Sequence, residues 1–369
     1  MRATKLIATV LGGLALLLAA LVVIADTGPG HRFIASRIAA LSPQTGLKIS
    51  IGRIEGSIYS QAQIHDLALS DPQGVFFTAP RVDLDWTPLA WLNNKLDIDR
   101  LHAKTARLDR LPKLRPGKPG QPILPGFDIH IGQLTIDRLD IGAKVAGKPR
   151  IGQLSGRADI HDRRALVDLV ADAQQGDRLA LKLDAAPDHD RFDVDATLDA
   201  PAQGVFGAML GTKRPVALRI TGDGSWRIWH GKLTAQIERQ QAADLALSAT
   251  SGRYALSGKI TASPFLKGRL QRLTAPVVTV AGAAGLENRR LDGYLALQSP
   301  ALMAEARGVI DLANSSFDDL LVTARLRQPP ALVANMTGRD VLLKARFDGA
   351  FGQASFDYLL TAPRVAFGQ

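Results

Sequence analysis

The chain has 369 residues, a formal net charge of +10 and no cysteine. The absence of cysteine excludes disulfide frameworks, thiolate metal sites and cysteine nucleophiles. The cations are spread singly along the chain, without a run rich in Lys and Arg or a basic patch interleaved with aromatic residues, so the pattern argues against nucleic-acid binding. A protein that lies beside anionic headgroups explains the same charge.

The first predicted element is a membrane anchor over residues 1–26. An apolar run of 19 residues extends from Leu6 to Ile24, after two cations and before Asp26, and this length can cross a bilayer as a helix. The flanking charges place the N-terminus in the cytoplasm and the body outside, which is the periplasm in a Gram-negative cell. A cleaved signal peptide is the alternative, because Val23-Ile24-Ala25 fits a cleavage site. The apolar residues expected to hold the anchor are Leu6, Leu11, Leu16, Leu17, Leu21 and Ile24.

Residues 27–111 are predicted to form a β-rich, membrane-proximal cap with short helices. The helical spacing of apolar residues predicts an amphipathic helix from Gly30 to Leu41. Strands follow, with a turn at 71–74 that has Pro at its second position, and a short helix is expected at Pro88–Asn93.

The segment 112–125 is predicted to be a linker or long exposed loop. It holds five prolines with two glycines between them, and proline cannot donate to a strand ladder. We take this segment as the boundary between the N-terminal part and the rest of the chain.

Residues 126–369 are predicted to form a repetitive, antiparallel β-meander. Apolar and polar residues alternate with period two in segments that recur every 10–14 residues, separated by turns such as Gly222-Asp223-Gly224. Each strand therefore has one apolar and one polar face. Helix is expected in the body only near Pro88–Asn93 and Ala202–Met209. The predicted fold class is mainly β, with a transmembrane helix followed by a long sheet curled into an apolar groove.

The apolar face has two interpretations. A sheet of this size must fold over on itself, either as a dry sandwich core or as an apolar channel that holds acyl chains. The pattern alone does not separate them, although the anchor favours lipid. The residues expected to share one continuous face and to line the groove are Leu181, Leu183, Phe192, Val194, Leu218, Ile220, Leu233, Ile237, Leu245 and Leu247.

No catalytic or metal-binding motif stands out. The stretch from Gly142 to Lys148 resembles the start of a phosphate-binding loop, but Pro149 replaces the Ser or Thr that would hold magnesium, so a hairpin turn is expected. Acidic pairs such as Asp83-x-Asp85 and Asp193-x-Asp195 share the polar face of a strand. We expect no enzyme activity, no cofactor and no metal.

An ordered series of loose motifs resembles the N-terminal part of the TamB family, the inner-membrane subunits of the translocation and assembly module in the AsmA-like group of bridge-like lipid transporters. The motifs are Ile51-Gly52-Arg53-Ile54-Glu55-Gly56, His65-Asp66-Leu67, Pro80-Arg81-Val82-Asp83-Leu84-Asp85-Trp86, Leu96-Asp97-Ile98-Asp99-Arg100-Leu101, Leu108-Asp109-Arg110-Leu111-Pro112, Leu198-Asp199-Ala200-Pro201, Gly222-Asp223-Gly224-Ser225-Trp226 and Phe347-Asp348-Gly349-Ala350-Phe351. Together they extend over nearly the whole chain.

The resemblance implies a β-groove, taco-like in section, that carries phospholipid between the inner and outer membranes. It also implies a role in outer-membrane biogenesis through an Omp85-type, TamA-like partner. That partner docks through a C-terminal region for which this chain has no counterpart, so we expect the chain to be a truncated part of a longer protein.

Two other classes of function stay open. A scaffold or chaperone would offer sheet edges to unfolded outer-membrane strands by β-augmentation, and it predicts an exposed edge. An envelope-anchored enzyme with an unrecognised site predicts polar residues clustered inside the groove. A lipid conduit predicts an apolar lining that continues from strand to strand.

Overall fold

The computed structural model describes residues 46–57, 61–113, 127–174, 176–186, 190–209, 212–225, 227–287, 290–312, 314–339 and 341–368. The predicted anchor over 1–26 and the predicted helix from Gly30 to Leu41 lie outside these residues and stay predictions. Within the described ranges, no helix combines the length and the apolarity needed to cross a bilayer.

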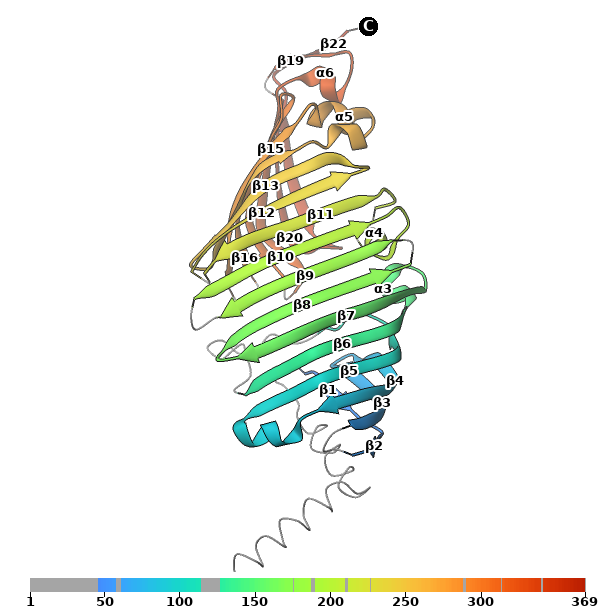
Figure 1. The fold of residues 1–369 in the computed structure, drawn as a ribbon. Helices are drawn as coiled ribbons and strands as arrows, with labels where there is room; N and C mark the ends of the chain where they lie inside the picture. Colours follow the sequence, from blue (N-terminus) through green and yellow to red (C-terminus); the bar gives the residue numbers. More distant parts are fainter. Residues whose placement is uncertain are drawn as a thin grey trace, which may run out of the picture. The chain divides into compact units, whose positions relative to one another are not determined.

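The described part of the chain is mainly β, as the period-two alternation predicts (Figure 1). Twenty strands belong to one sheet, and two short strands form a separate pair. The chain divides into two compact units, which are described separately below: unit 1 contains 1–183 and 203–213, and unit 2 contains 184–202 and 214–369.

Unit 1 is built from the first strands of the sheet. The strands are β1 Lys48–Ser50, β2 Arg53–Gly56, β3 Gln61–Asp71, β4 Gly74–Trp86, β5 Lys95–Leu108, β6 Asp128–Ile141, β7 Arg150–His161, β8 Arg164–Ala173 and β9 Asp177–Ala186, whose last three residues fall in unit 2. The helices are the 3₁₀ helix η1 Pro88–Asn93, α3 Ala143–Ala146 and α4 Val205–Met209.

Unit 2 contains the remaining strands and three short helices. The strands are β10 Arg191–Ala200, β11 Val216–Gly224, β12 Ile228–Ile237, β13 Gln240–Thr250, β14 Arg253–Ile260, β15 Val278–Glu287, β16 Arg290–Gln298, β17 Leu302–Asp311, β18 Ser316–Leu326, β19 Met336–Arg339, β20 Val341–Ala350, β21 Ser355–Thr361 and β22 Arg364–Phe367. The helices are η3 Ser263–Phe265, α5 Gly268–Thr274 and α6 Pro329–Leu332.

One strand pair departs from the predicted antiparallel meander. Strands β5 and β6 are parallel, with Lys95 opposite Asp128 and Leu108 opposite Ile141. Parallel neighbours need a connection of a dozen or more residues that returns along the strands. The Pro-rich segment 112–125 falls in this connection, so it joins two paired strands of unit 1 and does not separate the compact units. Its residues 114–125 lie outside the described part of the chain.

A line of kinks crosses the sheet of unit 1. In β3 the apolar positions Ile64 and Leu67 are three residues apart, and Asp66 between them has φ 54°. Pro80 stands opposite Asp66, where its missing N–H costs no ladder bond. In the β5–β6 ladder, Asp99 and Gly132 do not pair, although the residues on both sides of them do. At each kink the alternation of apolar and polar residues shifts by one residue. The apolar side chains on both sides of the kink therefore still point to the same face of the sheet.

The helix prediction was right at two places and wrong at others. Helices occur at Pro88–Asn93 and within Ala202–Met209, as expected. Four further short helices, α3, η3, α5 and α6, contradict the expectation that no other segment of the body is helical. The reason is local packing: Leu273 of α5 and Leu332 of α6 pack against one buried cluster at the strand ends. The connection Gly142–Lys148 does join two antiparallel strands, and it contains α3.

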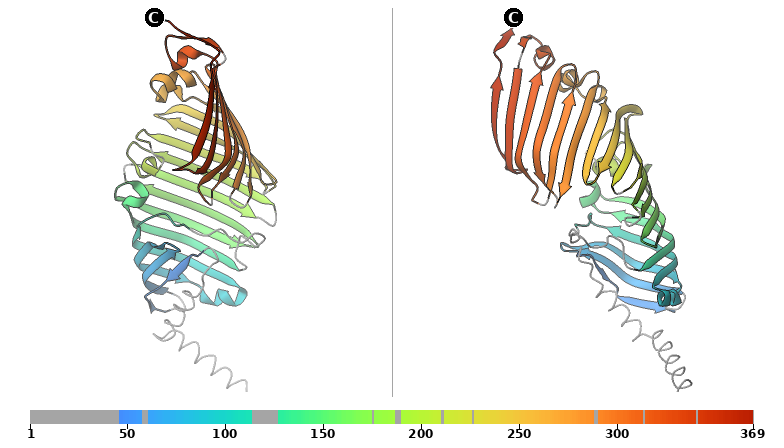
Figure 2. Two further views of the ribbon diagram at one scale, coloured as in Figure 1. Left: turned by 180° about the vertical axis from the view of Figure 1, so that it is seen from behind. Right: turned by 90° about the vertical axis from the view of Figure 1, so that its left-hand side faces the viewer.

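The sheet of unit 2 bends strongly along its length. The right-hand view of Figure 2 shows the orange and red strands β15–β21 nearly face-on, whereas the yellow strands β11–β14 are turned toward their edges. Figure 1 shows the opposite, with β11–β13 broad and the later strands narrow. Unit 2 is therefore a curved, single-layered sheet.

Candidate functional site

The candidate site is one face of the sheet in unit 2. Residues that stand opposite each other in adjacent strands point to the same face, so the register defines continuous rows across the sheet. The row through Leu218 continues on both sides, to Leu198 of β10 and to Ala235 of β12. We call the side that carries this row the apolar face.

Two rows cross all eleven strands of the sheet in unit 2. The first row is Ala196, Ile220, Leu233, Leu245, Gly258, Val280, Leu297, Ala304, Ala324, Leu343 and Leu360. The second row is Val194, Gly222, Gly231, Leu247, Leu256, Gly282, Leu295, Ala306, Val322, Ala345 and Tyr358. Neither row contains a charged residue. At the usual strand spacing each row extends over about 48 Å.

The opposite face has the chemistry of a solvated surface. The corresponding row there includes Arg219 opposite Thr234, and Asp244 opposite Lys259. Ion pairs connect neighbouring strands, as between Arg219 and Asp195, whose charged atoms are 3.0 Å apart. Exposed and half-buried residues alternate along β17 and β18, and the half-buried ones lie on the apolar face. The two faces therefore differ in both charge and exposure.

The predicted groove residues can now be placed. Val194, Leu218, Ile220, Leu233, Ile237, Leu245 and Leu247 share the apolar face by register. Phe192 joins them because its ring lies 6.0 Å from that of Trp229, measured between centroids. Leu181 and Leu183 lie on β9 in unit 1, outside the rows just described. The shared face is thus found for eight of the ten residues, and their contact with lipid stays a prediction.

Aromatic rings mark the margin of the apolar face that lies away from the helices. The Trp229 ring lies over two glycines, because a Cβ on Gly222 or Gly231 would come within 2.1 or 2.3 Å of it. The ring therefore packs closely against the backbone of two adjacent strands. At the far end of unit 2, rings of Phe317, Phe347 and Phe356 form a chain of contacts about 6 Å between centroids.

Short helices close the other margin. Leu326, Met336 and Val341 are buried there, and Leu273 of α5 and Leu332 of α6 pack against them. Ser299 donates a hydrogen bond of 2.6 Å to the carbonyl oxygen of Leu273, which fixes α5 to the β16–β17 turn. We call this side, with residues 261–277 and 327–335, the helical margin.

The last strand of the sheet is exposed along its whole length. Strand β21 pairs with β20, and all seven of its residues are exposed. Its apolar side chains include Phe356 at 59%, Tyr358 at 67% and Leu360 at 59% exposure. The apolar face therefore continues to β21, whose outer edge has no partner strand in the described sheet.

Unit 1 has an apolar face as well, but much of it is closed. Ala79, Val82, Ala103, Ala106 and Ile136 form a buried cluster, and partly buried side chains from β3, β5, β6 and β7 pack around it. Small Ala side chains let the strands approach closely. This part of unit 1 is a dry core. The face opens again on β8, where Val167 and Leu169 are only half-buried.

A buried carboxylate fixes the start of the long connection after β5. Asp71 accepts hydrogen bonds of 2.6 and 2.5 Å from the Arg110 guanidinium and further bonds from the backbone N–H groups of Gln73 and Lys113. The bonds from Arg110, the largest cause, hold the pKa of the Asp71 carboxyl well below its ordinary value. Sequence reasoning missed this pair, because the two residues are far apart in the chain.

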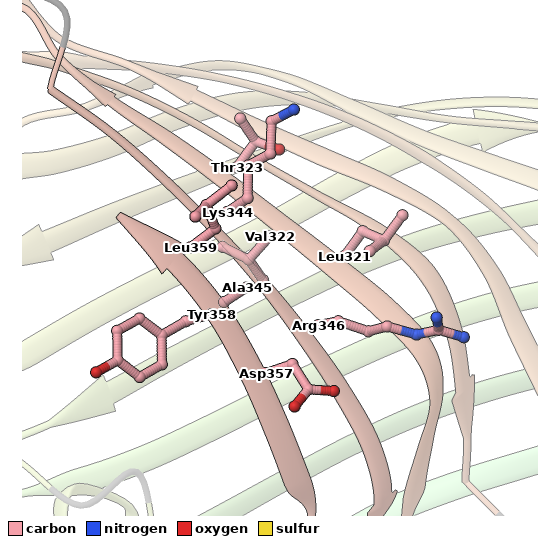
Figure 3. A pocket seen from close by; sticks show the side chains of 9 residues that line it. All are labelled: Leu321, Val322, Thr323, Lys344, Ala345, Arg346, Asp357, Tyr358 and Leu359. Atoms are coloured by element: carbon pink, nitrogen blue, oxygen red, sulfur yellow. The ribbon is translucent and has the colours of Figure 1, made fainter. Parts of the chain in front are cut away.

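The acidic pairs noted in the sequence form local ion pairs. Within the described ranges no three His, Asp or Glu side chains gather as metal ligands. Asp83, Asp97 and Asp193, which belong to the acidic pairs noted in the sequence, each bind a cation two residues earlier on the same strand face. Figure 3 shows a shallow hollow between β18, β20 and β21, where Thr323, Lys344, Arg346 and Asp357 lie spread along the strands.

Comparisons with known proteins leave the family open. No family model matches the chain, and neither the curated proteins nor the solved structures contain a match to it. The functional argument therefore rests on the residues and on their arrangement.

Proposed function

We propose that the chain is an inner-membrane-anchored, periplasmic segment of a lipid conduit. It moves phospholipid between the inner and outer membranes and takes part in outer-membrane biogenesis together with a TamA-like outer-membrane partner. The acyl chains lie against the apolar face of unit 2, and the headgroups stay in water.

The observation that carries the proposal is the pair of uncharged rows across eleven strands. A structural core needs apolar residues only where another element covers them. In the described part of unit 2, the extensive contacts of the middle strands are with their neighbours in the sheet. An apolar face that continues without interruption for about 48 Å suits a ligand that slides along it, because no position demands desolvation of a charge.

The test is site-specific photo-crosslinking in cells. A crosslinker at Val194 or Leu218 should capture phospholipid, and one at Asp195 or Arg219 should not. The four positions form a matched set, since Val194 and Leu218 lie on the apolar face and Asp195 and Arg219 form an ion pair on the other face of the same two strands. Equal lipid capture from both faces would refute the conduit.

A second candidate function has its own observation. Strand β21 leaves its outer edge without a partner in the described sheet, and its apolar side chains are exposed. A scaffold for outer-membrane β-barrel proteins would add a client strand there by β-augmentation. In that case crosslinkers at Phe356 and Tyr358 would capture protein, and crosslinkers at Val194 and Leu218 would capture little lipid.

A further inference from the structure

The helical margin of unit 2 differs in charge from the opposite ends of the same strands. Exposed cations lie on and beside α5, and the segment 261–277 contains no carboxylate. The cations at this margin are Lys267, Arg269, Arg272 and Arg327, and Lys259 and Arg325 lie on the adjoining strand ends. The strand ends on the other side carry both signs of charge, with cations such as Arg253 and Arg290 beside many acids, among them Asp223, Glu287, Asp292, Asp311, Asp318 and Asp348.

These cations are not used to hold the fold through ion pairs. In the described residues, no carboxylate oxygen lies within 4.0 Å of a charged nitrogen of Lys267, Arg269 or Arg327. Most carboxylates on the strand faces, in contrast, have a cation beside them, such as Asp195 with Arg219. The charge at the helical margin is therefore available to an external anion.

An apolar side chain projects from the same surface. Leu273 of α5 packs inward against the cluster of Leu326 and Met336, which fixes the helix on the strand ends. Leu270, one turn earlier, is 60% exposed between Arg269 and Arg272. A leucine flanked by cations on a rigidly attached helix is typical of segments that sit in the headgroup region of a bilayer, where the apolar side chain inserts and the cations meet phosphate.

We propose that the helical margin of unit 2 docks on the surface of an anionic phospholipid bilayer, with Leu270 inserted and Lys267 and Arg269 against the headgroup phosphates. This contact does not depend on lipid transport along the apolar face. It would give the sheet a second attachment to a membrane, through the strand ends.

The experiment uses the full chain, immobilised through an N-terminal tag, and vesicles in flow. The chain should bind vesicles that contain phosphatidylglycerol several-fold more tightly than vesicles of phosphatidylcholine alone, and added salt should weaken the binding. The variant Lys267→Glu/Arg269→Glu should lose at least about thirty-fold in affinity, because each of the two cations near an anionic surface contributes roughly 1 kcal/mol. Leu270→Ser should reduce binding at high salt as well, where the charge contribution is screened.

The matched control is Arg253→Glu/Lys182→Glu. It makes the same change in net charge at two exposed cations outside the helical margin, and it should keep the affinity of the unmodified chain. Equal loss in both double variants would reduce the effect to net charge and overturn the proposal. Equal binding to both kinds of vesicle would overturn it too. So would binding of single-stranded RNA that depends on Lys267 and Arg269 when vesicles are not bound.

Discussion

Units 1 and 2 differ in how far the apolar face of their sheet is covered. Both present apolar side chains on one face of a sheet. In unit 1 the strands β3–β7 bring these side chains together into a buried cluster around Ala79 and Ile136. In unit 2 most residues of the corresponding rows are half-buried or exposed, although Val280 and Ala345 are buried, and the helices close one margin only.

The backbone explains part of this difference. Unit 1 contains kinks at Asp66 and Pro80 and a parallel strand pair, and kinks increase local twist and allow a sheet to coil on itself. The rows of unit 2 run from β10 to β21 with shifts of register at a few places. The following predictions test this contrast.

The largest expected difference concerns lipid capture by the two units. A crosslinker at Leu245 in unit 2 should capture at least about ten times more phospholipid than one at Ile136, because Ile136 is 6% exposed within a dry cluster. Mass spectrometry of the adducts measures this ratio, and circular dichroism checks that both variants are folded. Comparable capture at Ile136 would mean that the unit 1 core opens, and the contrast between the units would fail.

A charge on the apolar face should separate transport from folding. Leu218→Asp should reduce lipid crosslinking at Val194 by about ten-fold, since burying an unpaired carboxylate against acyl chains costs several kcal/mol. Thr234→Asp is the control, because Thr234 stands opposite Arg219 on the polar face. If Leu218→Asp leaves a folded protein with undiminished capture, the apolar face does not carry the lipid.

The glycines beneath Trp229 test whether unit 2 depends on close ring packing. Gly231→Ala should destabilise the protein by about 1–3 kcal/mol, because the new Cβ would lie 2.3 Å from the ring and the ring must move. Gly285→Ala provides the comparison, since no atom lies within 4 Å of a Cβ there and the substitution should be neutral or slightly stabilising. Urea unfolding measures both, and equal effects would argue against a packing role for the ring.

Substitutions at Asp66 test whether the kink in β3 of unit 1 depends on the left-handed backbone conformation of this residue. Asp66 has φ 54°, so Asp66→Val should cost about 1–3 kcal/mol while Asp66→Gly is tolerated. The midpoint of urea unfolding distinguishes them. Two variants of equal stability would show that the left-handed backbone at this position carries no cost.

The smallest effect concerns the Asp71–Arg110 pair. Because the folded state lowers the pKa of Asp71, the pair stabilises the fold above the unfolded pKa of about 3.9 and loses this contribution as the pH falls toward the folded value. Asp71→Asn should therefore lower the thermal midpoint at pH 7, and the difference from the unmodified chain should shrink below about pH 4. A difference that is constant with pH would assign the effect to packing.

The alternation of residues such as Leu218, Arg219 and Ile220 determined by itself that the chain is mainly β and that each strand has one apolar face. This works because side chains point alternately to opposite faces of a strand, so local sequence reports the face directly. It also located the helices at Pro88–Asn93 and 202–209, where turn residues interrupt the alternation.

Only the tertiary structure decided which strands are neighbours and what their faces meet. The parallel pairing of β5 with β6, the fixation of α5 through Leu273 and the ion pair of Asp71 with Arg110 all join residues that are distant in the chain. The same alternating pattern specified a closed core in unit 1 and an open face in unit 2. A period of two says which side of a strand is apolar, but the curvature of the sheet decides whether that side is covered.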